Sequence, residues 1–212
     1  MSCMTDTAPG KTKAAFDLEI ELALVEKNAK RKLRVGANIT FERLHKLIQA
    51  AYCWHEAHLY QFLLFKEGKE GAQPSVEIVT DKEEASNPKT ARLVHQAKLI
   101  DYLDEYKHVL YIYDFGDGWT HYIDVAGKLD DGGDNLPLLI SGENDAPPED
   151  CGGADGFADF LEIMSKPRHK EHKEMKEWAA EQGWQPFELQ RAALRVWMTG
   201  NPGRSVWVKD GG

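Results

Sequence analysis

The sequence predicts an α+β fold: an antiparallel sheet built from hairpins, packed against helices, with a C-terminal helical segment. Residues 16–24 and 109–125 alternate apolar and polar side chains with the period of two that is typical of half-buried strands. Residues 41–53 instead place apolar side chains at helical spacing. Three further helix-like stretches lie between residues 155 and 198, after the last predicted strand.

The first half of the chain is expected to hold a hairpin, a helix and two more strands. A strand over 16–24 is followed by an antiparallel return over Arg31–Val35. Thr40 fits the N-cap of a helix over 41–53, on which His45 is expected at the surface. Strands are also predicted over 59–65 and 76–80, loops over 66–74 and 81–89, and a short helix over 93–103.

The stretch Tyr111–Val125 is predicted to form a second hairpin, whose turn is Gly116–Gly118 because glycine tolerates positive φ. Asp114 and Asp117 would flank this turn, and His121 would lie along the return strand. Two interpretations remain open. The carboxylates and the imidazole form a pocket, or the aspartates hydrogen-bond turn amides and His121 is a satisfied, half-buried strand residue.

The segment 127–153 is rich in glycine and proline and is expected to be a long ordered loop without regular structure. If it folds over the hairpin, its acidic corner would add carboxylates suited to Mg²⁺ or Mn²⁺. Upstream, His58 is expected to pack its ring beside Tyr60, and only the resemblance described below keeps it in the set. The candidate pocket comprises His58, Asp114, Asp117, Trp119, His121, Glu149 and Asp150, and the candidate metal ligands are Asp114, Asp117, His121, Glu149 and Asp150.

Helices are predicted from Asp155, which can cap the first of them, over about 169–182, and over about 186–198. Pro186 would occupy the first turn of the last helix, where proline is favoured. The middle helix interleaves lysine with glutamate, a pattern that is typical of a solvated, salt-bridged face.

Several runs resemble the plasmid pRiA4b ORF-3-like family. YDFGDGWTH at 113–121 is followed by PPEDCGG at 147–153, and LHKLIQAAYCW at 44–54 is followed by HLYQF at 58–62. The resemblance extends from about residue 16 to 196 and implies an α+β fold, but no established activity; some members are carried by mobile elements. The chain departs from the family pattern at 29–32, and at Ala146, where the family commonly has a cysteine. The second departure weakens any cysteine-based metal site.

Charge is distributed unevenly along the chain, which has a formal net charge of -9. Residues 129–161 include nine acidic side chains and no lysine or arginine, so this segment would repel a phosphate backbone unless cations intervened. A basic cluster predicted at a hairpin tip is the candidate nucleic-acid contact, although a solvated strand edge is the alternative. Its members are Lys30, Arg31, Lys32 and Arg34.

Length and composition favour one domain over about 15–199, preceded by a disordered leader at 1–14 and followed by a tail at 200–212. The three cysteines are far apart and suit neither a disulfide framework nor a structural zinc site. No stretch has the roughly 20 apolar residues of a membrane span, and the N-terminus lacks a secretory pattern. Cytoplasmic residence is expected.

These features favour a non-enzymatic interaction module, in keeping with a protein partner and a link to mobile elements. The alternative is a metal-dependent hydrolase or nuclease that uses the carboxylate and histidine pocket, with His121 as a ligand or general base. Direct nucleic-acid binding through the basic cluster is the weakest of the three hypotheses, because the net charge opposes it. The sequence establishes no cofactor. A divalent metal ion is expected only if the pocket forms.

Overall fold

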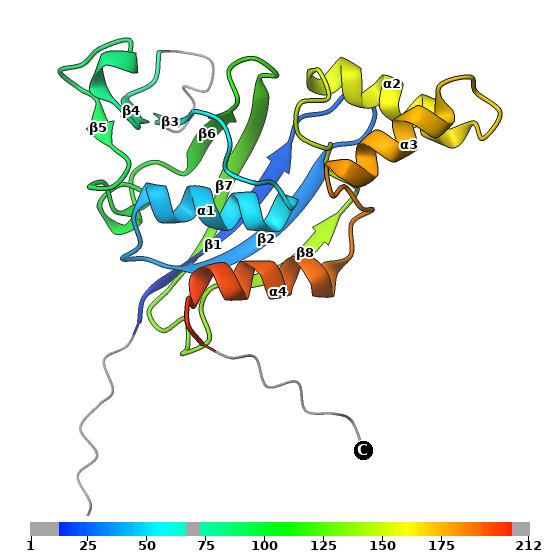
Figure 1. The fold of residues 1–212 in the computed structure, drawn as a ribbon. Coiled ribbons are helices and arrows are strands. Elements are labelled where there is room, and N and C mark those ends of the chain that lie inside the picture. The colour runs from blue at the N-terminus through cyan, green and yellow to red at the C-terminus, as the bar shows by residue number, and fades with distance from the viewer. Residues whose placement is uncertain (1–12, 67–72, 205–212) are drawn as a thin grey trace, which may run out of the picture.

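The computed structural model describes residues 13–66 and 73–204, which form a twisted eight-stranded sheet with helices packed on it (Figure 1). The strands are β1 (Ala15–Leu22), β2 (Ala29–Gly36), β3 (Tyr60–Phe65), β4 (Val76–Val79), β5 (Arg92–Leu93), β6 (His108–Tyr113), β7 (Trp119–Leu129) and β8 (Leu138–Glu143). Their order in the sheet is β5-β4-β3-β6-β7-β1-β2-β8, and every neighbouring pair is antiparallel except β4 and β5. The predicted fold class is confirmed. Most of the predicted leader and tail lies outside the described residues.

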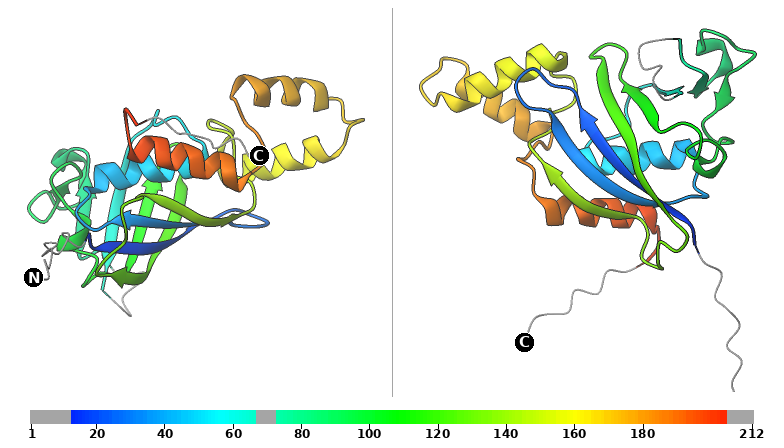
Figure 2. Two further views of the ribbon diagram at one scale, coloured as in Figure 1. Left: turned by 90° about the horizontal axis from the view of Figure 1, so that it is seen from below. Right: turned by 180° about the vertical axis from the view of Figure 1, so that it is seen from behind.

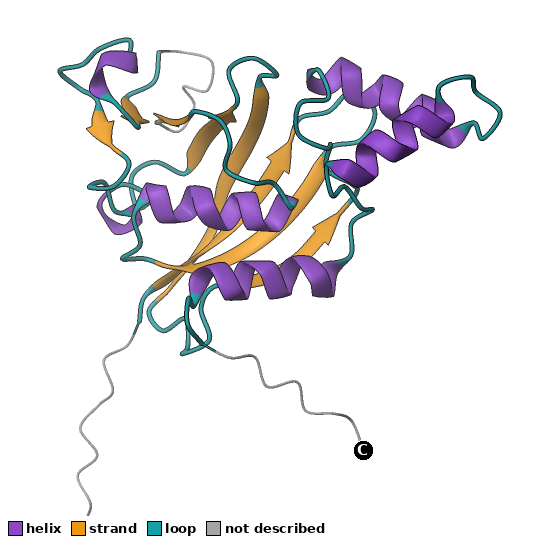
Figure 3. Cartoon of the chain, viewed as in Figure 1, coloured by secondary structure: helices purple, strands orange, loops and turns teal. Residues whose placement is uncertain are grey.

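Two helices cover one face of the sheet, and no described helix covers the other (Figures 2 and 3). The α-helices are α1 (Phe41–Tyr52), α2 (Gly153–Ser165), α3 (His172–Glu181) and α4 (Leu189–Gly200), and two 3-10 helices are η1 (Lys82–Glu84) and η2 (Leu99–Asp101). Helices α1 and α4 lie side by side on the covered face, whereas α2 and α3 form a helical hairpin beyond the end of the sheet. None of the described helices is long and apolar enough to cross a membrane.

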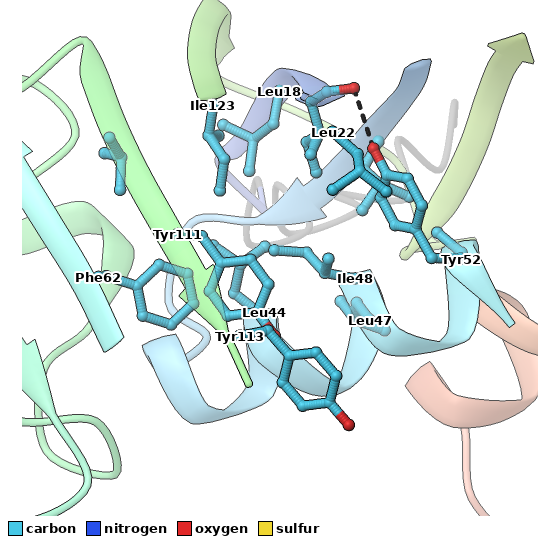
Figure 4. Close-up of a cluster of buried hydrophobic side chains, with 14 of the residues drawn as sticks. Leu18, Leu22, Leu44, Leu47, Ile48, Tyr52, Phe62, Tyr111, Tyr113 and Ile123 are labelled. Carbon is cyan, nitrogen blue, oxygen red and sulfur yellow. Dashed lines mark hydrogen bonds between the residues drawn. The ribbon is translucent and has the colours of Figure 1, made fainter. Parts of the chain in front are cut away.

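The core lies between the central strands and α1 (Figure 4). Alternation along β1 buries Leu18, Ile20 and Leu22 on the helix side, where they meet the apolar stripe of α1. Thr40 caps α1 as predicted, because its hydroxyl accepts the N–H of Arg43 at 3.2 Å. The predicted hairpins β1–β2 and β6–β7 are both present and lie next to each other through the pairing of β1 with β7.

Strand β8 corrects the expectation that residues 127–153 lack regular structure. It forms because the outer edge of β2 offers backbone donors and acceptors, and Lys30–Arg34 pair with it. Gly142 belongs in this strand for a steric reason. A Cβ atom there would lie 2.5 Å from the ring of Phe187 and 3.0 Å from Cδ of Arg31. The glycine that suggested a loop instead makes room for a packed ring.

The short helix predicted over 93–103 is confirmed only at Leu99–Asp101, which form the 3-10 helix η2, and the segment begins at the last residue of β5. Its backbone bonds to neighbouring elements instead: Val94 donates to the carbonyl of Val79 at 3.0 Å, and Ala97 accepts from the N–H of Phe41 at 3.0 Å. Tertiary hydrogen bonds therefore interrupt the helix, and local bonds of helical spacing remain only in short pieces, such as the N–H of Leu103 to the carbonyl of Leu99 at 2.9 Å.

The starts of two C-terminal helices also differ from the predicted ones. Asp155 lies inside the first turn of α2, which begins at Gly153 without a side-chain cap. Pro186 precedes α4 rather than starting it, because Asp145 holds the N–H of Phe187 at 2.6 Å and keeps this segment extended. Glu188 then caps α4.

Candidate metal centre

The hairpin turn between β6 and β7 holds Asp114 in a left-handed backbone conformation, with φ of 56°. Its Oδ1 accepts the N–H groups of Gly116 at 2.9 Å and Asp117 at 3.4 Å, so half of this carboxylate stabilises the turn. The other oxygen, Oδ2, lies 3.7 Å from Nε2 of His58. Asp114 therefore fits both of the interpretations that the sequence left open.

The Pro-Pro-Glu-Asp corner at 147–150 folds directly onto this hairpin. The indole N–H of Trp54 donates to the carbonyl of Pro147 at 2.8 Å, and Asp117 accepts the N–H of Gly152 at 3.2 Å. Gly153 packs so closely that a Cβ atom there would lie 2.8 Å from the carbonyl oxygen of Asp117. The structure thus brings together carboxylates that are about thirty residues apart in the sequence.

Three ligand-type side chains converge where the corner meets the turn: His58, Asp114 and Asp150. One nitrogen or oxygen atom from each lies within 4.8 Å of the others. Nε2 of His58 is 3.2 Å from Oδ1 of Asp150. This nitrogen is shielded from solvent, yet it has no hydrogen bond of acceptable angle within the described part of the chain.

Glu149 lies beside this cluster but has a different set of partners. Its Oε1 accepts the hydroxyl of Tyr113 at 2.5 Å, and its Oε2 accepts both the backbone N–H of His55 at 2.9 Å and its ring nitrogen Nδ1 at 2.8 Å. Burial, followed by this carboxylate, raises the pKa of Tyr113 well above its ordinary value and keeps the phenol protonated. Sequence reasoning missed His55 as a site residue. Its position three residues before the candidate His58 was the signal that could have found it.

His121 and Trp119 lie beneath the cluster and outside it. His121 is 0% exposed and contacts the rings of Tyr52, Trp54 and Tyr111 at centroid distances of 4.9 to 5.5 Å. Burial lowers the pKa of His121 from its ordinary 6.5 to about 3, against a smaller opposing effect of nearby backbone groups. Neither ring nitrogen finds a partner of good geometry among residues 13–66 and 73–204. His121 is therefore a neutral core residue, neither half-buried nor satisfied.

His45 corrects the expectation that it lies on the surface. It is 3% exposed and stacks on Tyr60, with centroids 3.5 Å apart and planes 1° from parallel. Its Nδ1 is 2.7 Å from the hydroxyl of Tyr111. Burial lowers the pKa of His45 to about 3. Tyr60 is thus the neighbour of His45, whereas His58 meets the edge of Tyr113 at 5.7 Å.

The basic cluster does not form a hairpin tip, because its members lie along β2. Three of them, one exposed and two half-buried, pair with acids on the adjacent β1: Lys30 with Glu21 at 3.2 Å, Lys32 with Glu19 at 2.8 Å and Arg34 with Asp17 at 2.7 Å. Arg31 points to the other face, where it is buried and donates to four backbone carbonyls. The side chains proposed to contact phosphate are therefore largely neutralised by the protein itself.

Cys151 lies next to Asp150, but its thiol is not a metal ligand of the usual kind. Burial, helped by Asp117 and Asp150, raises the pKa of the thiol to about 12. A protonated thiol binds metals and attacks electrophiles poorly, since the thiolate is the reactive form. The donor atoms available at this corner are therefore those of the imidazole and the carboxylates.

Comparisons with known proteins identify the family of the chain and the fold that it shares with a solved structure. The family model described as plasmid pRiA4b ORF-3-like protein matches residues 14–193, and these include the hairpin turn, the Pro-Pro-Glu-Asp corner and His58. The chain belongs to this family. It is 34% identical over 161 residues to the uncharacterized protein y4hQ of Sinorhizobium fredii, covering 76% of this chain and 78% of that protein.

The fold of this pRiA4b ORF-3-like protein is also found in a solved structure. The crystal structure of the protein of unknown function MM3350 from Methanosarcina mazei Go1 matches with a TM-score of 0.70 and 27% sequence identity. The match covers 85% of this chain and 97% of that one. The similarity spans nearly the whole of the smaller molecule, so the relationship concerns the domain rather than one motif.

Proposed function

We propose that this pRiA4b ORF-3-like protein binds a divalent metal ion through Nε2 of His58, Oδ2 of Asp114 and Oδ1 of Asp150. The observation that carries the proposal is the solvent-shielded Nε2 of His58, which lies 3.2 Å and 3.7 Å from the two carboxylate oxygens. A cation placed between these atoms would satisfy the imidazole lone pair and both acids together. Of the five metal ligands suggested by the sequence, this proposal keeps Asp114 and Asp150.

The donor set favours some ions over others. Carboxylate oxygens suit hard ions such as Mg²⁺ and Mn²⁺, whereas an imidazole nitrogen favours Mn²⁺ and Zn²⁺. We therefore expect Mn²⁺ and Zn²⁺ to bind more tightly than Mg²⁺. Three protein ligands leave coordination positions for water or substrate, the pattern of catalytic rather than structural sites.

The open positions make metal-dependent hydrolysis the reaction class that this site supports best. A bound divalent ion supplies a water of lowered pKa. His55 is the candidate proton acceptor, because Glu149 holds its Nδ1 and so orients the ring, leaving Nε2 as the second nitrogen. This pairing of a carboxylate and an imidazole is the orienting arrangement that a general base requires.

Metal binding is tested first without reference to any reaction. Thermal unfolding is measured after treatment with EDTA and then with added Mn²⁺, Zn²⁺ or Mg²⁺; an ion at about 100 times its Kd adds about 2.7 kcal/mol to the stability of the native state. Asp150→Asn should abolish the stabilisation. Asp159→Asn, an exposed acid of the same acidic segment, is the matched control and should retain it. No shift with any ion would overturn the proposal.

A second candidate function, the interaction module, is supported by the face of the sheet that no described helix covers. A hollow of about 690 Å³ lies on this face, and the exposed Tyr122 contributes to its wall. Acids outnumber bases around the hollow, and Glu19 and Glu21 pair with Lys32 and Lys30, so the described surface lacks the unpaired positive charge that a polyanion needs. The charged side chains that line it are Glu19, Glu21, Asp124 and Glu143 against Lys30 and Lys32.

The interaction role is tested with two exposed apolar residues on opposite faces. Tyr122 is 52% exposed on the open face, and Leu194 is 44% exposed on α4. A protein captured with the wild-type chain is purified, and its Kd is measured against Tyr122→Glu and Leu194→Glu. At least tenfold weaker binding to Tyr122→Glu alone is expected, and equal binding to both variants would refute this role.

A further inference from the structure

A groove of about 450 Å³ runs between α2 and α3 and reaches the Pro-Pro-Glu-Asp corner. Its apolar wall is formed by Phe160, Met175 and Trp178. The helical hairpin that carries this wall projects beyond the sheet in both views of Figure 2, so the groove lies outside the main core. Its volume is within the range of about 300 to 1,000 Å³ that is typical of small-molecule sites.

The apolar wall is held in place by aromatic packing. Phe160 is buried and meets Trp178 and Trp184 edge to face, at centroid distances of 6.2 and 5.0 Å. Met175 and Trp178 are three residues apart on α3, so they face the same side of the helix. Both are only partly buried, so part of each side chain is available to a ligand in the groove.

The charges that line the groove are all negative. Asp150 lies at the end next to the hairpin turn, and Glu171 and Glu174 lie at the α3 end; no basic side chain lines it. Lys170 reaches Glu171 at 3.2 Å, but the lysine side chain is 82% exposed, and such a pair contributes little in water. The groove therefore favours a positively charged occupant, and the indole of Trp178 adds an aromatic face that attracts cations.

We propose that this groove binds a small organic cation with an apolar body, of the aryl- or alkylammonium class. The body lies on Met175 and Trp178, which the buried Phe160 supports, and the ammonium group faces Glu171 and Glu174. This inference goes beyond the metal site, with which the groove shares only Asp150. It also favours a small amphiphilic ligand over a nucleic acid, because a polyanion would meet three carboxylates in the groove.

The proposal is tested with probes that differ in charge but share the aromatic body. Phenethylammonium and 3-phenylpropionate are titrated into the full chain by calorimetry, with EDTA and again with Mn²⁺. We expect phenethylammonium to bind at least fivefold more tightly than 3-phenylpropionate under both conditions, and raised salt to reduce this preference. EDTA removes metal ions, so a preference for phenethylammonium in EDTA supports the groove whether or not the metal proposal holds. Equal binding of the two probes, or no saturable binding of phenethylammonium up to about 10 mM, would overturn the inference.

Variants on α3 locate the bound probe. Glu174→Gln should weaken the binding of phenethylammonium by about threefold, because one attractive charge is lost. The binding of 3-phenylpropionate should become no weaker. Glu177→Gln is the matched control: it lies on the same helix outside the groove, where it pairs with Lys173, and should bind as the wild type does. Met175→Ala should weaken the binding of both probes, since it removes part of the apolar wall. This variant is chosen because replacing Trp178 would be a greater risk to folding. Unchanged binding to both Glu174→Gln and Met175→Ala would refute the site.

Discussion

Two buried histidines, His45 and His121, predict that the protein loses stability steeply as the pH falls below 6.5. Burial lowers the pKa of both rings to about 3, so the folded protein keeps them neutral. The unfolded chain binds a proton on each ring below 6.5, the ordinary value. Because the unfolded state then binds more protons than the folded state, the free energy of unfolding decreases as the pH decreases.

The expected magnitude follows from these values. Each ring contributes a slope of about 1.4 kcal/mol per pH unit between 6.5 and 3, so at pH 5 each costs about 2 kcal/mol and the pair about 4 kcal/mol. This is a large share of the roughly 5 to 15 kcal/mol that stabilises a typical domain. The effect is absent above pH 7.

The assay is urea unfolding followed by tryptophan fluorescence at several pH values from 7.5 to 5. His121→Phe keeps an aromatic ring among Tyr52, Trp54 and Tyr111, and His45→Gln keeps a hydrogen-bonding side chain. Each variant should flatten the pH dependence by about 1.4 kcal/mol per unit. His95→Gln, at an exposed position, is the control and should keep the wild-type slope. If both core variants keep that slope too, the argument from buried neutral histidines is wrong.

Three further substitutions test the packing around the candidate site. Gly153→Ala should destabilise the protein by more than Gly133→Ala in chemical denaturation: both residues have positive φ, but only the first would place a Cβ atom 2.8 Å from the carbonyl of Asp117. Gly153→Ala should lower the free energy of unfolding by on the order of 1 to 3 kcal/mol more than Gly133→Ala does. Equal losses in the two variants would contradict the close approach of Gly153 to Asp117. Gly142→Ala should cost on the order of 1 to 3 kcal/mol in the same assay, because it displaces an aromatic ring; a neutral effect would show that the ring moves freely. Glu149→Gln should cost about 1 to 3 kcal/mol at pH 7 by leaving its buried partners poorly satisfied, and an unchanged midpoint would refute that role.

Local patterns were sufficient for the strands and the helix whose sequence periodicity matches their burial. The alternation of residues 16–24 gave β1 within two residues of its C-terminal end, and Thr40 marked the start of α1. Strand β8 could not be predicted this way. Its glycine is explained only by the ring of Phe187, which lies more than forty residues further along the chain.

The candidate site was predictable in outline, but its membership was not. Asp-Gly pairs and a Pro-Pro turn predict tight corners, and two such corners carrying acids suggested a shared pocket. Which acids face each other depends on the rotation of each corner. Asp114 and Asp150 turn toward His58, Glu149 turns toward Tyr113, and His121 points into the core. The period of two places His121 on the buried face of β7, a signal that its polarity obscured.

The position of β1 in the sheet has a consequence for biosynthesis. This strand precedes the other described strands in the chain, yet it lies between β2 and β7, and its register pairs Ala15 with Leu129. More than a hundred residues must leave the ribosome before its second edge is covered, and closing so distant a contact slows folding. Until then the nascent chain carries an apolar strand with one open edge, the kind of surface that chaperones protect. Translation pauses before β7 has left the ribosome would lengthen that exposure, whereas later pauses would not.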